Sequence, residues 1–312
     1  MSYVNTVIDK VYVINLERDR TRLHTFDAEM KRHGISYTRF PAVLGTEIKY
    51  DDGLTKACNQ ICTAGMKGCA LSHRAIWEDM LKNRYENVLI FEDDASLIDN
   101  FEQVFRDGWS QLPNDYDIYY LGCHATCENS DPSSKVFNKV FNTAPEQIDS
   151  HLKSVQGSLG THAYILSEKC AKVLVDTPIG THVDLQMTLW IKELGLSAYS
   201  ITPLVVHVEG QTESNLSDSF PQLLNSLLHP FYLFDSIPLD RAATEHWFQL
   251  GGYPVNLILV ILSLLILVLP KQFIVGVFGW LLIELIYSRD FKATWRYFVV
   301  LGIVSALKKW LI

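Results

Sequence analysis

The stretch VLIFEDDASL, from Val88 to Leu97, joins a buried strand to a cluster of acidic side chains. Its apolar residues lead directly into Glu92, Asp93 and Asp94, and small residues follow. Three adjacent carboxylates repel one another, so folding alone gives no reason to place them at the end of a buried strand. In an open α/β sheet, ligands bind at the carboxyl ends of the strands. The stretch therefore predicts a strand and, at its end, a functional site.

Divalent metal binding is one explanation for the three carboxylates. Mg²⁺ and Mn²⁺ prefer oxygen ligands and often take substrate phosphates as further ligands. The triplet would then hold a cation that in turn holds a diphosphate. The alternative is an acidic turn that caps a following helix in LIDNFEQVF, residues 97–105, because carboxylates are stabilised at a helix N-terminus. The local residues leave both explanations open.

The residues around this stretch alternate between strand-like and helix-like patterns. Apolar strands are expected at residues 10–16, 36–43, 87–91, 115–122 and 197–208. Helical spacing of apolar residues is found in residues 17–34, 68–85 and 183–195, and residues 161–178 contain a strand followed by a helix. Such alternation is typical of βαβ units, so we expect an α/β fold with a mainly parallel sheet and helices on both faces.

Composition limits the function and the compartment. The chain has 312 residues, enough for roughly two units, and its net charge of -8 argues against a general nucleic-acid binder. The N-terminus lacks the apolar run of a signal peptide, which favours the cytosolic face. The six cysteines have spacings of C-x3-C and C-x6-C, which do not fit the common zinc patterns. We expect reduced, mostly buried thiols, with a structural metal as the alternative.

Towards the end of the chain the composition changes abruptly to apolar runs. The first two, residues 253–269 and 273–287, are each about 25 Å long as helices, slightly short of the roughly 30 Å core of a bilayer. Glu284 would be costly if it faced lipid. We expect a catalytic domain over residues 1–250 and a membrane-associated hydrophobic helical hairpin over residues 251–312. A two-span hairpin, an interfacial hairpin and a buried helical subdomain all stay open, and the basic residues that follow favour the cytosolic side for the catalytic domain.

Five motifs occur in an order that resembles glycosyltransferase family 25. They are VYVINLERDRTRL (11–23), GCALSHRAIWEDML (68–81), VLIFEDDASL (88–97), DIYYLG (117–122) and THAYILSEKCAKVL (161–174). The family includes lipopolysaccharide galactosyltransferases and collagen galactosyltransferases. The resemblance implies a GT-A-like fold and transfer of a hexose from a nucleotide sugar with inversion. It covers residues 11–218 and leaves the apolar C-terminus unexplained.

The acidic motif of the family corresponds here to the triplet that ends the buried strand. The resemblance implies that Glu92 and Asp94 bind Mn²⁺ (or Mg²⁺) and that Asp93 contacts the ribose or the metal. The chain has E-D-D where the family pattern is D-x-D. The assignment of ligands within the triplet therefore stays open.

Two motifs ahead of the triplet supply candidates for binding the nucleotide or the donor sugar. Asn15, Arg18 and Arg22 follow the first strand and resemble the start of the donor site in the family. A solvated helix face is the alternative for both arginines. Ser72 and His73 lie in the motif LSHRAIW and are candidates for contact with the donor. A lone histidine on a packed helix is, however, more often structural.

Three elements after the triplet complete the expected site. Asp184, at the start of a helix, is the candidate base that deprotonates the acceptor hydroxyl, and a helix N-cap is its alternative role. His207, at the end of the last strand, is a candidate metal ligand; otherwise it packs or contacts the diphosphate. Gln211, Ser217 and Asp218 resemble a polar loop that closes over the donor.

These observations predict a membrane-associated enzyme. We expect it to transfer galactose or glucose from a nucleotide sugar, UDP-linked, to a saccharide or glycolipid acceptor, with the membrane contacted through the C-terminal region. A metal-dependent phosphatase or nucleotidyltransferase would use the same carboxylates. A membrane-anchored sugar-nucleotide-binding protein with a degenerate transferase domain is the non-enzymatic alternative.

Overall fold

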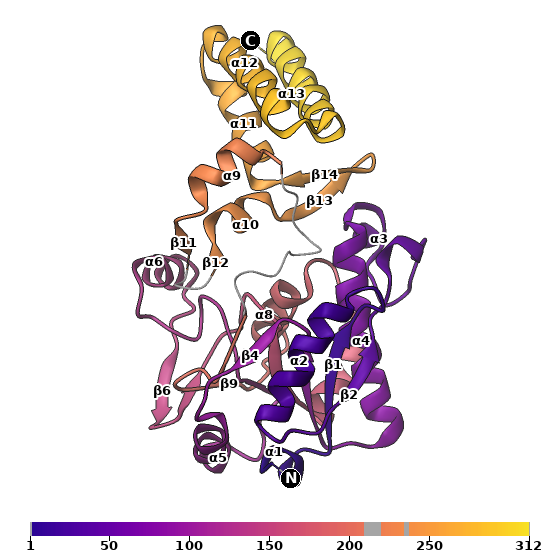
Figure 1. Ribbon diagram of the computed structural model, residues 1–312, viewed down its shortest axis with the longest axis vertical. Coiled ribbons are helices and arrows are strands. Elements are labelled where there is room, and N and C mark those ends of the chain that lie inside the picture. The colour runs from indigo at the N-terminus through magenta and orange to yellow at the C-terminus, as the bar shows by residue number, and fades with distance from the viewer. Residues whose placement is uncertain (1, 209–219, 234–236, 312) are drawn as a thin grey trace. The chain divides into compact units, whose positions relative to one another are not determined.

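The computed structural model describes residues 2–208, 220–233 and 237–311, which form two compact units (Figure 1). The first unit consists of Met1–Gln60 and Ala64–Thr212, and the second of Ile61–Thr63 and Glu213–Ile312. The second unit therefore begins earlier in the chain than the boundary expected at residue 250. The segment ahead of the apolar runs belongs with those runs rather than with the sheet.

A central sheet of eight strands forms the first unit. Its order is β2 (Thr38–Pro41), β1 (Lys10–Asn15), β3 (Asn87–Glu92), β8 (Ala163–Ser167), β5 (Ile118–Tyr120), β9 (Ala198–Ile201), β7 (Leu152–Ser154) and β6 (Glu146–Asp149). The pairings make β8 and β7 antiparallel to their neighbours, while the other strands run in one direction. The expected mainly parallel sheet is confirmed, with two reversed strands that the sequence pattern did not indicate.

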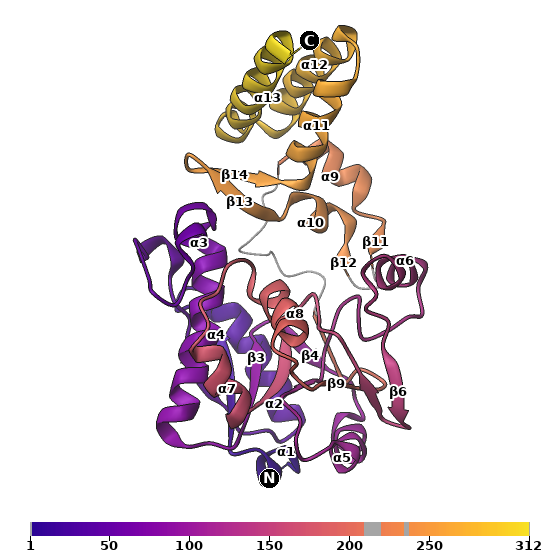
Figure 2. The same ribbon diagram turned by 180° about the vertical axis from the view of Figure 1, so that it is seen from behind.

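Helices cover both faces of this sheet (Figures 1 and 2). On one face lie α2 (Arg20–Arg32) and α5 (Phe101–Gln111), whose Phe26 and Phe105 share a core with Leu89 and Phe91 of β3. On the other face lie α4 (Ala64–Asn83), α7 (Glu168–Val175) and α8 (Val183–Glu193). Residues that alternate along a strand point to opposite faces, so each strand contributes to two cores.

Two glycines explain how α4 docks on the chain that follows β2. A Cβ atom added to Gly45 would lie 1.6 Å from the carbonyl oxygen of Ala64, and one added to Gly68 would lie 2.7 Å from that of Val43. Only glycine allows the two backbones to approach this closely. The helix accordingly begins at Ala64, ahead of its expected start at residue 68, and carries Gly68 in its interior.

The acidic triplet is followed by a short strand rather than by a helix. β4 (Ala95–Leu97) pairs antiparallel with β10 (Val206–Val208), and His207 lies directly opposite Ser96. Helix α5 begins only at Phe101, with Asn100 as its N-cap. The alternative role of the carboxylates as a helix cap is therefore wrong.

The remaining elements of the first unit are short. They are α1 (Val4–Val7), the 3-10 turn η1 (Gly45–Glu47), α3 (Lys56–Ile61) and α6 (Pro132–Phe141). Cys123 forms a disulfide with Cys127, and Cys58 and Cys62 are disulfide-bonded as well. Cys69 and Cys170 carry thiols. The expectation of reduced thiols is thus wrong for four of the six cysteines, because sequence spacing alone does not show which side chains meet.

The second unit is built on three apolar helices rather than on a two-helix hairpin. These are α11 (Leu257–Val268), α12 (Lys271–Ser288) and α13 (Phe291–Leu311), which share a core with α9 (Gln222–Leu228) and α10 (Leu239–Thr244). The hairpins of β11 (Tyr232–Leu233) with β12 (Ile237–Pro238) and of β13 (His246–Leu250) with β14 (Tyr253–Asn256) complete the unit. Within the described parts of the chain, α12 is the helix that is long and apolar enough to cross a membrane.

Candidate active site

The end of β3 directs the three carboxylates to two different sides of the sheet. Glu92 accepts a hydrogen bond from Thr161 Oγ1 (2.7 Å) and lies near His73 of α4. Asp93 instead contacts Arg22 of α2 and Asn15 of β1. This division follows from strand geometry, because successive side chains point to opposite faces. The triplet is therefore not one cluster, although its members are adjacent in the sequence.

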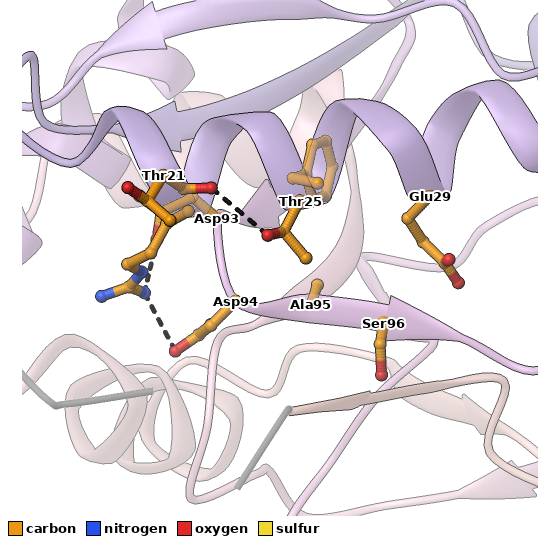
Figure 3. A pocket seen from close by; sticks show the side chains of 9 residues that line it. Thr21, Thr25, Glu29, Asp93, Asp94, Ala95 and Ser96 are labelled. Carbon is orange, nitrogen blue, oxygen red and sulfur yellow. Dashed lines mark hydrogen bonds and ion pairs between the residues drawn. The ribbon is translucent and has the colours of Figure 1, made fainter. Parts of the chain in front are cut away.

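Arg22 joins Asp93 and Asp94 on the α2 side (Figure 3). Its Nη2 atom contacts Asp93 Oδ1 and lies 3.1 Å from Asp94 Oδ2. Asn15 donates from Nδ2 to Asp93 Oδ2 at 2.6 Å, and the Oδ1 atom of Asn15 accepts from Arg39 Nε at 2.9 Å. The expected nucleotide-site residues Asn15 and Arg22 are thus connected to the acidic turn. The alternative of a solvated helix face does not apply to Arg22, which is 20 % exposed.

Burial sets the protonation behaviour of two of the acids. Burial raises the pKa of the Asp93 carboxyl above its ordinary value, and Arg22 and Asn15 offset only part of this effect. Burial also acts to raise the pKa of Glu92, but the neighbouring His73 and Thr161 outweigh it and leave that pKa below its ordinary value. Glu92 is therefore an anion at neutral pH, held by a different set of partners from Asp93.

A pocket opens between α2 and β4 beside the acidic turn. Its lining consists of Thr21, Arg22, Thr25, Phe26, Glu29, Asp93, Asp94, Ala95 and Ser96. In Figure 3 the side chains of Asp94 and Ser96 leave β4 on the same side, and Ala95 points the other way. The pocket thus presents one guanidinium, three carboxylates and three hydroxyls, a polar set in which acidic groups outnumber basic ones.

The pairing of β4 with β10 brings His207 to the same side as Asp94. His207 is opposite Ser96, and a diagonal neighbour two residues along a partner strand is within reach of long side chains. Carboxylate oxygens and an imidazole nitrogen form a donor set that accepts Mn²⁺. Binding of a divalent cation by Asp94 and His207, with Asp93, stays a prediction; the described side chains whose ligand atoms lie within 4.8 Å of one another are Cys69, His73 and Glu92.

The structure places the other expected residues as follows. The Ser72 hydroxyl donates to Gly68 O at 2.6 Å and accepts from Val43 N, so it joins α4 to the chain after β2. The exposed side chain of Arg18 is directed towards Asp19, at 3.7 Å. Gln211, Ser217 and Asp218 lie outside the described residues.

Asp184 occupies the first turn of α8, at the carboxyl edge of the sheet. The N-cap of this helix is His182, so the alternative role of Asp184 as an N-cap is wrong. Asp184 is close enough to Tyr120, at the end of β5, to help burial raise the pKa of that tyrosine. One strand, β8, separates β5 from β3, which carries the acidic turn. The role of Asp184 as a base stays a prediction.

Several contributing residues were not expected from the sequence. Thr161, Ser96 and Arg39 contact or flank the acidic residues, and Cys69 lies one helical turn before His73. The small polar residue in ASL after the triplet was a signal for Ser96, since it alternates with two apolar neighbours. Nothing local in the sequence indicated Thr161, which reaches Glu92 from the start of a distant strand.

An α/β sheet with acidic and basic side chains at its carboxyl edge is typical of a protein that binds its ligand at that edge. The profile of glycosyltransferase family 25 (LPS biosynthesis protein) matches residues 8–187, more than half of the chain. The chain therefore belongs to glycosyltransferase family 25.

Curated relatives agree with this assignment. A "Glycosyltransferase 25 family member" of Drosophila melanogaster is 26 % identical over 220 residues, which are 64 % of this chain and 35 % of the relative. A relative from Haemophilus influenzae is 26 % identical over 226 residues, 66 % of this chain and 75 % of the relative. The "Lipooligosaccharide biosynthesis protein lex-1" of the same bacterium is 29 % identical over 120 residues, 38 % of each chain. The chain thus spans only about a third of the length of the insect relative.

Proposed function

We propose that this protein transfers a hexose, galactose or glucose, from a UDP-linked sugar to a saccharide acceptor with inversion. The observation that carries the proposal is the joining of Arg22 to Asp93 and Asp94 at the carboxyl edge of the sheet, in a chain of glycosyltransferase family 25. This edge of the sheet has a guanidinium that can bind a nucleoside diphosphate and carboxylates that can bind its cation. The sheet with its flanking helices is compatible with a GT-A-like fold.

Asp94 and His207, with Asp93, would hold Mn²⁺ or Mg²⁺. When bound, such a cation supplies charge that offsets the growing charge of the leaving diphosphate. Glu92 is left out of this set because it faces His73 on the other side of the sheet. Arg22, released from Asp94, would turn to the diphosphate, where a guanidinium binds two oxygens at once. Asn15 keeps Asp93 oriented through its 2.6 Å hydrogen bond.

Asp184 is the proposed base. An inverting transfer needs one carboxylate that removes the proton of the acceptor hydroxyl as the sugar leaves the diphosphate, and it needs no covalent intermediate. Asp184 accepts a hydrogen bond from Leu185 N at 2.7 Å, which restrains the orientation of its carboxylate.

A donor screen tests this proposal. Purified protein with Mn²⁺ is given each nucleotide sugar in turn, and release of the nucleoside diphosphate is measured with and without EDTA. We expect release from one UDP-sugar that EDTA abolishes and that Asp94→Asn also abolishes. Release of phosphate from simple phosphate esters would indicate the phosphatase or nucleotidyltransferase instead. Binding of a nucleotide sugar with no turnover on any acceptor would indicate the degenerate binding protein.

The second unit supports a membrane-linked acceptor. Its helices expose large apolar side chains, including Val275, which is 74 % exposed, and Ile286. α12 is about 27 Å long at 1.5 Å per residue, close to the thickness of the hydrocarbon core. Glu284 does not oppose insertion, because its buried carboxylate accepts hydrogen bonds from Leu223 N and Leu224 N at the start of α9. A lipid-linked saccharide would then be concentrated beside the enzyme.

Flotation with lipid vesicles tests membrane binding. We expect the wild type to float and Val275→Glu to float much less, because a charge on a lipid-facing helix is costly. Val136→Glu is the matched control, since Val136 is also exposed (64 %) but lies on α6 of the first unit. Equal flotation of both variants would show that α12 does not enter lipid.

Two observations disagree about which side of the membrane the catalytic unit occupies. Basic residues after α12 favour a cytosolic catalytic unit, in which case Cys123 and Cys127 would be kept reduced. Their disulfide favours an oxidising compartment, because such bonds are rare in the cytosol. Because both side chains are buried, the cells are quenched with acid and the thiols are alkylated under denaturing conditions; mass spectrometry then decides between the two compartments. Labelled Cys123 and Cys127 would support the cytosolic side, and protected ones would exclude it.

A further inference from the structure

A second group of metal-binding side chains lies on the α4 side of the sheet, away from Arg22. α4 carries Cys69 and His73 four residues apart, so both point from one face of the helix. Glu92, at the end of β3, meets that face. One ligand atom from each of the three side chains lies within 4.8 Å of the other two.

His73 is held with one ring nitrogen directed into this cluster. The side chain is fully buried, and its Nδ1 atom is 2.9 Å from the hydroxyl of Tyr164, which also accepts from Trp77 Nε1 at 3.0 Å. The Nε2 atom lies 3.6 Å from Glu92 Oε1 and has no hydrogen-bond partner among the described residues. Nε2 is thus directed at the Glu92 carboxylate without a hydrogen bond of its own, which leaves it able to bind a ligand shared with that carboxylate.

The distance between His73 and Glu92 suits a small cation bound by both. Zinc lies about 2.0–2.3 Å from nitrogen, oxygen and sulfur ligands, so two ligand atoms of a tetrahedral site are roughly 3.3–3.7 Å apart. The separation of 3.6 Å between His73 Nε2 and Glu92 Oε1 falls in that range. The thiol of Cys69 lies within 4.8 Å of a ligand atom of each of the other two side chains.

We propose that Cys69, His73 and Glu92 bind one zinc-class divalent cation on the α4 side of the sheet. A thiolate and an imidazole select such an ion over Mg²⁺ or Mn²⁺, which prefer oxygen ligands. Binding converts the Cys69 thiol to a thiolate and releases its proton to solvent. Tyr164 and Thr161 fix the orientation of His73 and Glu92 from outside the ligand set.

This site is chemically distinct from the one proposed for the transfer reaction. Asp94 and His207 offer oxygen and nitrogen on the α2 side, and neither set shares a ligand with the other. A cation on the α4 side would join α4 to the last residue of β3 and so fix the start of the acidic turn. Three protein ligands leave a fourth position for water, and Cys69 and Glu92 are partly exposed to it.

Cobalt(II) is the probe, because a cobalt–thiolate bond gives a charge-transfer absorption in the near ultraviolet that oxygen and nitrogen ligands do not give. The full-length protein, without added reductant, is titrated with Co²⁺. We expect one equivalent to produce the band and Zn²⁺ to displace it. Cys69→Ser should lose the band, whereas Cys170→Ser should keep it, because Cys170 is the other thiol and is buried elsewhere on α7.

The outcomes separate this proposal from the proposed transferase activity. Absence of the band in the folded wild type, or its persistence in Cys69→Ser, would overturn the zinc-class site. Zinc in the protein as purified, measured by elemental mass spectrometry and lost in Cys69→Ser, is the second supporting result. A failed donor screen would leave either result unchanged, since the cobalt band requires no nucleotide sugar.

Discussion

Replacement of Arg22 by glutamine tests whether this side chain neutralises the acidic turn until a cation binds. Arg22, Asp93 and Asp94 are 20 %, 7 % and 8 % exposed, so their contacts are largely shielded from water. Removing one partner of a buried ion pair costs about 3–5 kcal/mol, because the remaining charge stays buried. The partial exposure of Arg22 favours the lower end, about 3 kcal/mol.

For a unit of this size that loss corresponds to a fall in Tm of roughly 6–12 °C. Thermal unfolding of Arg22→Gln is measured with and without Mn²⁺, and Arg20→Gln is the control. Arg20 is on the same helix, is 84 % exposed and only approaches Glu17, so its loss should change Tm by no more than about 2 °C.

Mn²⁺ should restore much of the stability lost in Arg22→Gln and should stabilise this variant more than the wild type. In the wild type the cation must first displace the guanidinium from Asp94, whereas in the variant the carboxylates already face one another without a counter-charge. The reasoning is refuted if Arg22→Gln and Arg20→Gln unfold at the same temperature. An identical shift with Mn²⁺ in Arg22→Gln and the wild type would refute the competition between arginine and metal.

Three further predictions concern single positions. Asp184→Asn should leave the affinity for the nucleotide sugar unchanged and lower kcat at least about 100-fold, which is the scale of general base catalysis. An equal loss of affinity, measured by calorimetry, would assign Asp184 to donor binding. Glu284→Gln should destabilise the second unit by about 1–3 kcal/mol, because the backbone amides of Leu223 and Leu224 lose an ionised acceptor. Unchanged hydrogen exchange at these two amides would contradict the predicted loss of stability. Asp131→Ala should cost about 1 kcal/mol in denaturant unfolding, since Asp131 caps α6 through Ser133 N and Ser134 N.

Much of the first unit could be predicted from sequence periodicity. The apolar run ending at Glu92 and the helical spacing from Arg20 to Arg32 both appear close to their expected positions. These patterns are local, and each element buries the face that its own residues define. The separation of Glu92 from Asp93 could also have been predicted, because adjacent residues of a strand point to opposite faces.

The parts that could not be predicted depend on contacts between distant segments. β4 has three residues, too few for a period to be recognised, and exists because β10 pairs with it. The spacing of Cys123 and Cys127 fits a disulfide only once the loop between them is folded. The early start of α4 depends on Gly68 meeting the backbone of Val43, a contact that no local pattern indicates.

The pairing of β4 with β10 has a consequence for the order of events during translation. Ser96 and His207 face each other across this pair, yet about 110 residues separate them in the chain. At an elongation rate of about 5–20 residues per second, Ser96 leaves the ribosome roughly 6–20 s before His207 does. Throughout that interval the nascent chain has the acidic turn without His207 and without the partner that residues 95–97 need in order to form β4. A premature stop in that interval would release a chain that has its carboxylates but lacks β10 and, depending on the position of the stop, further strands of the sheet.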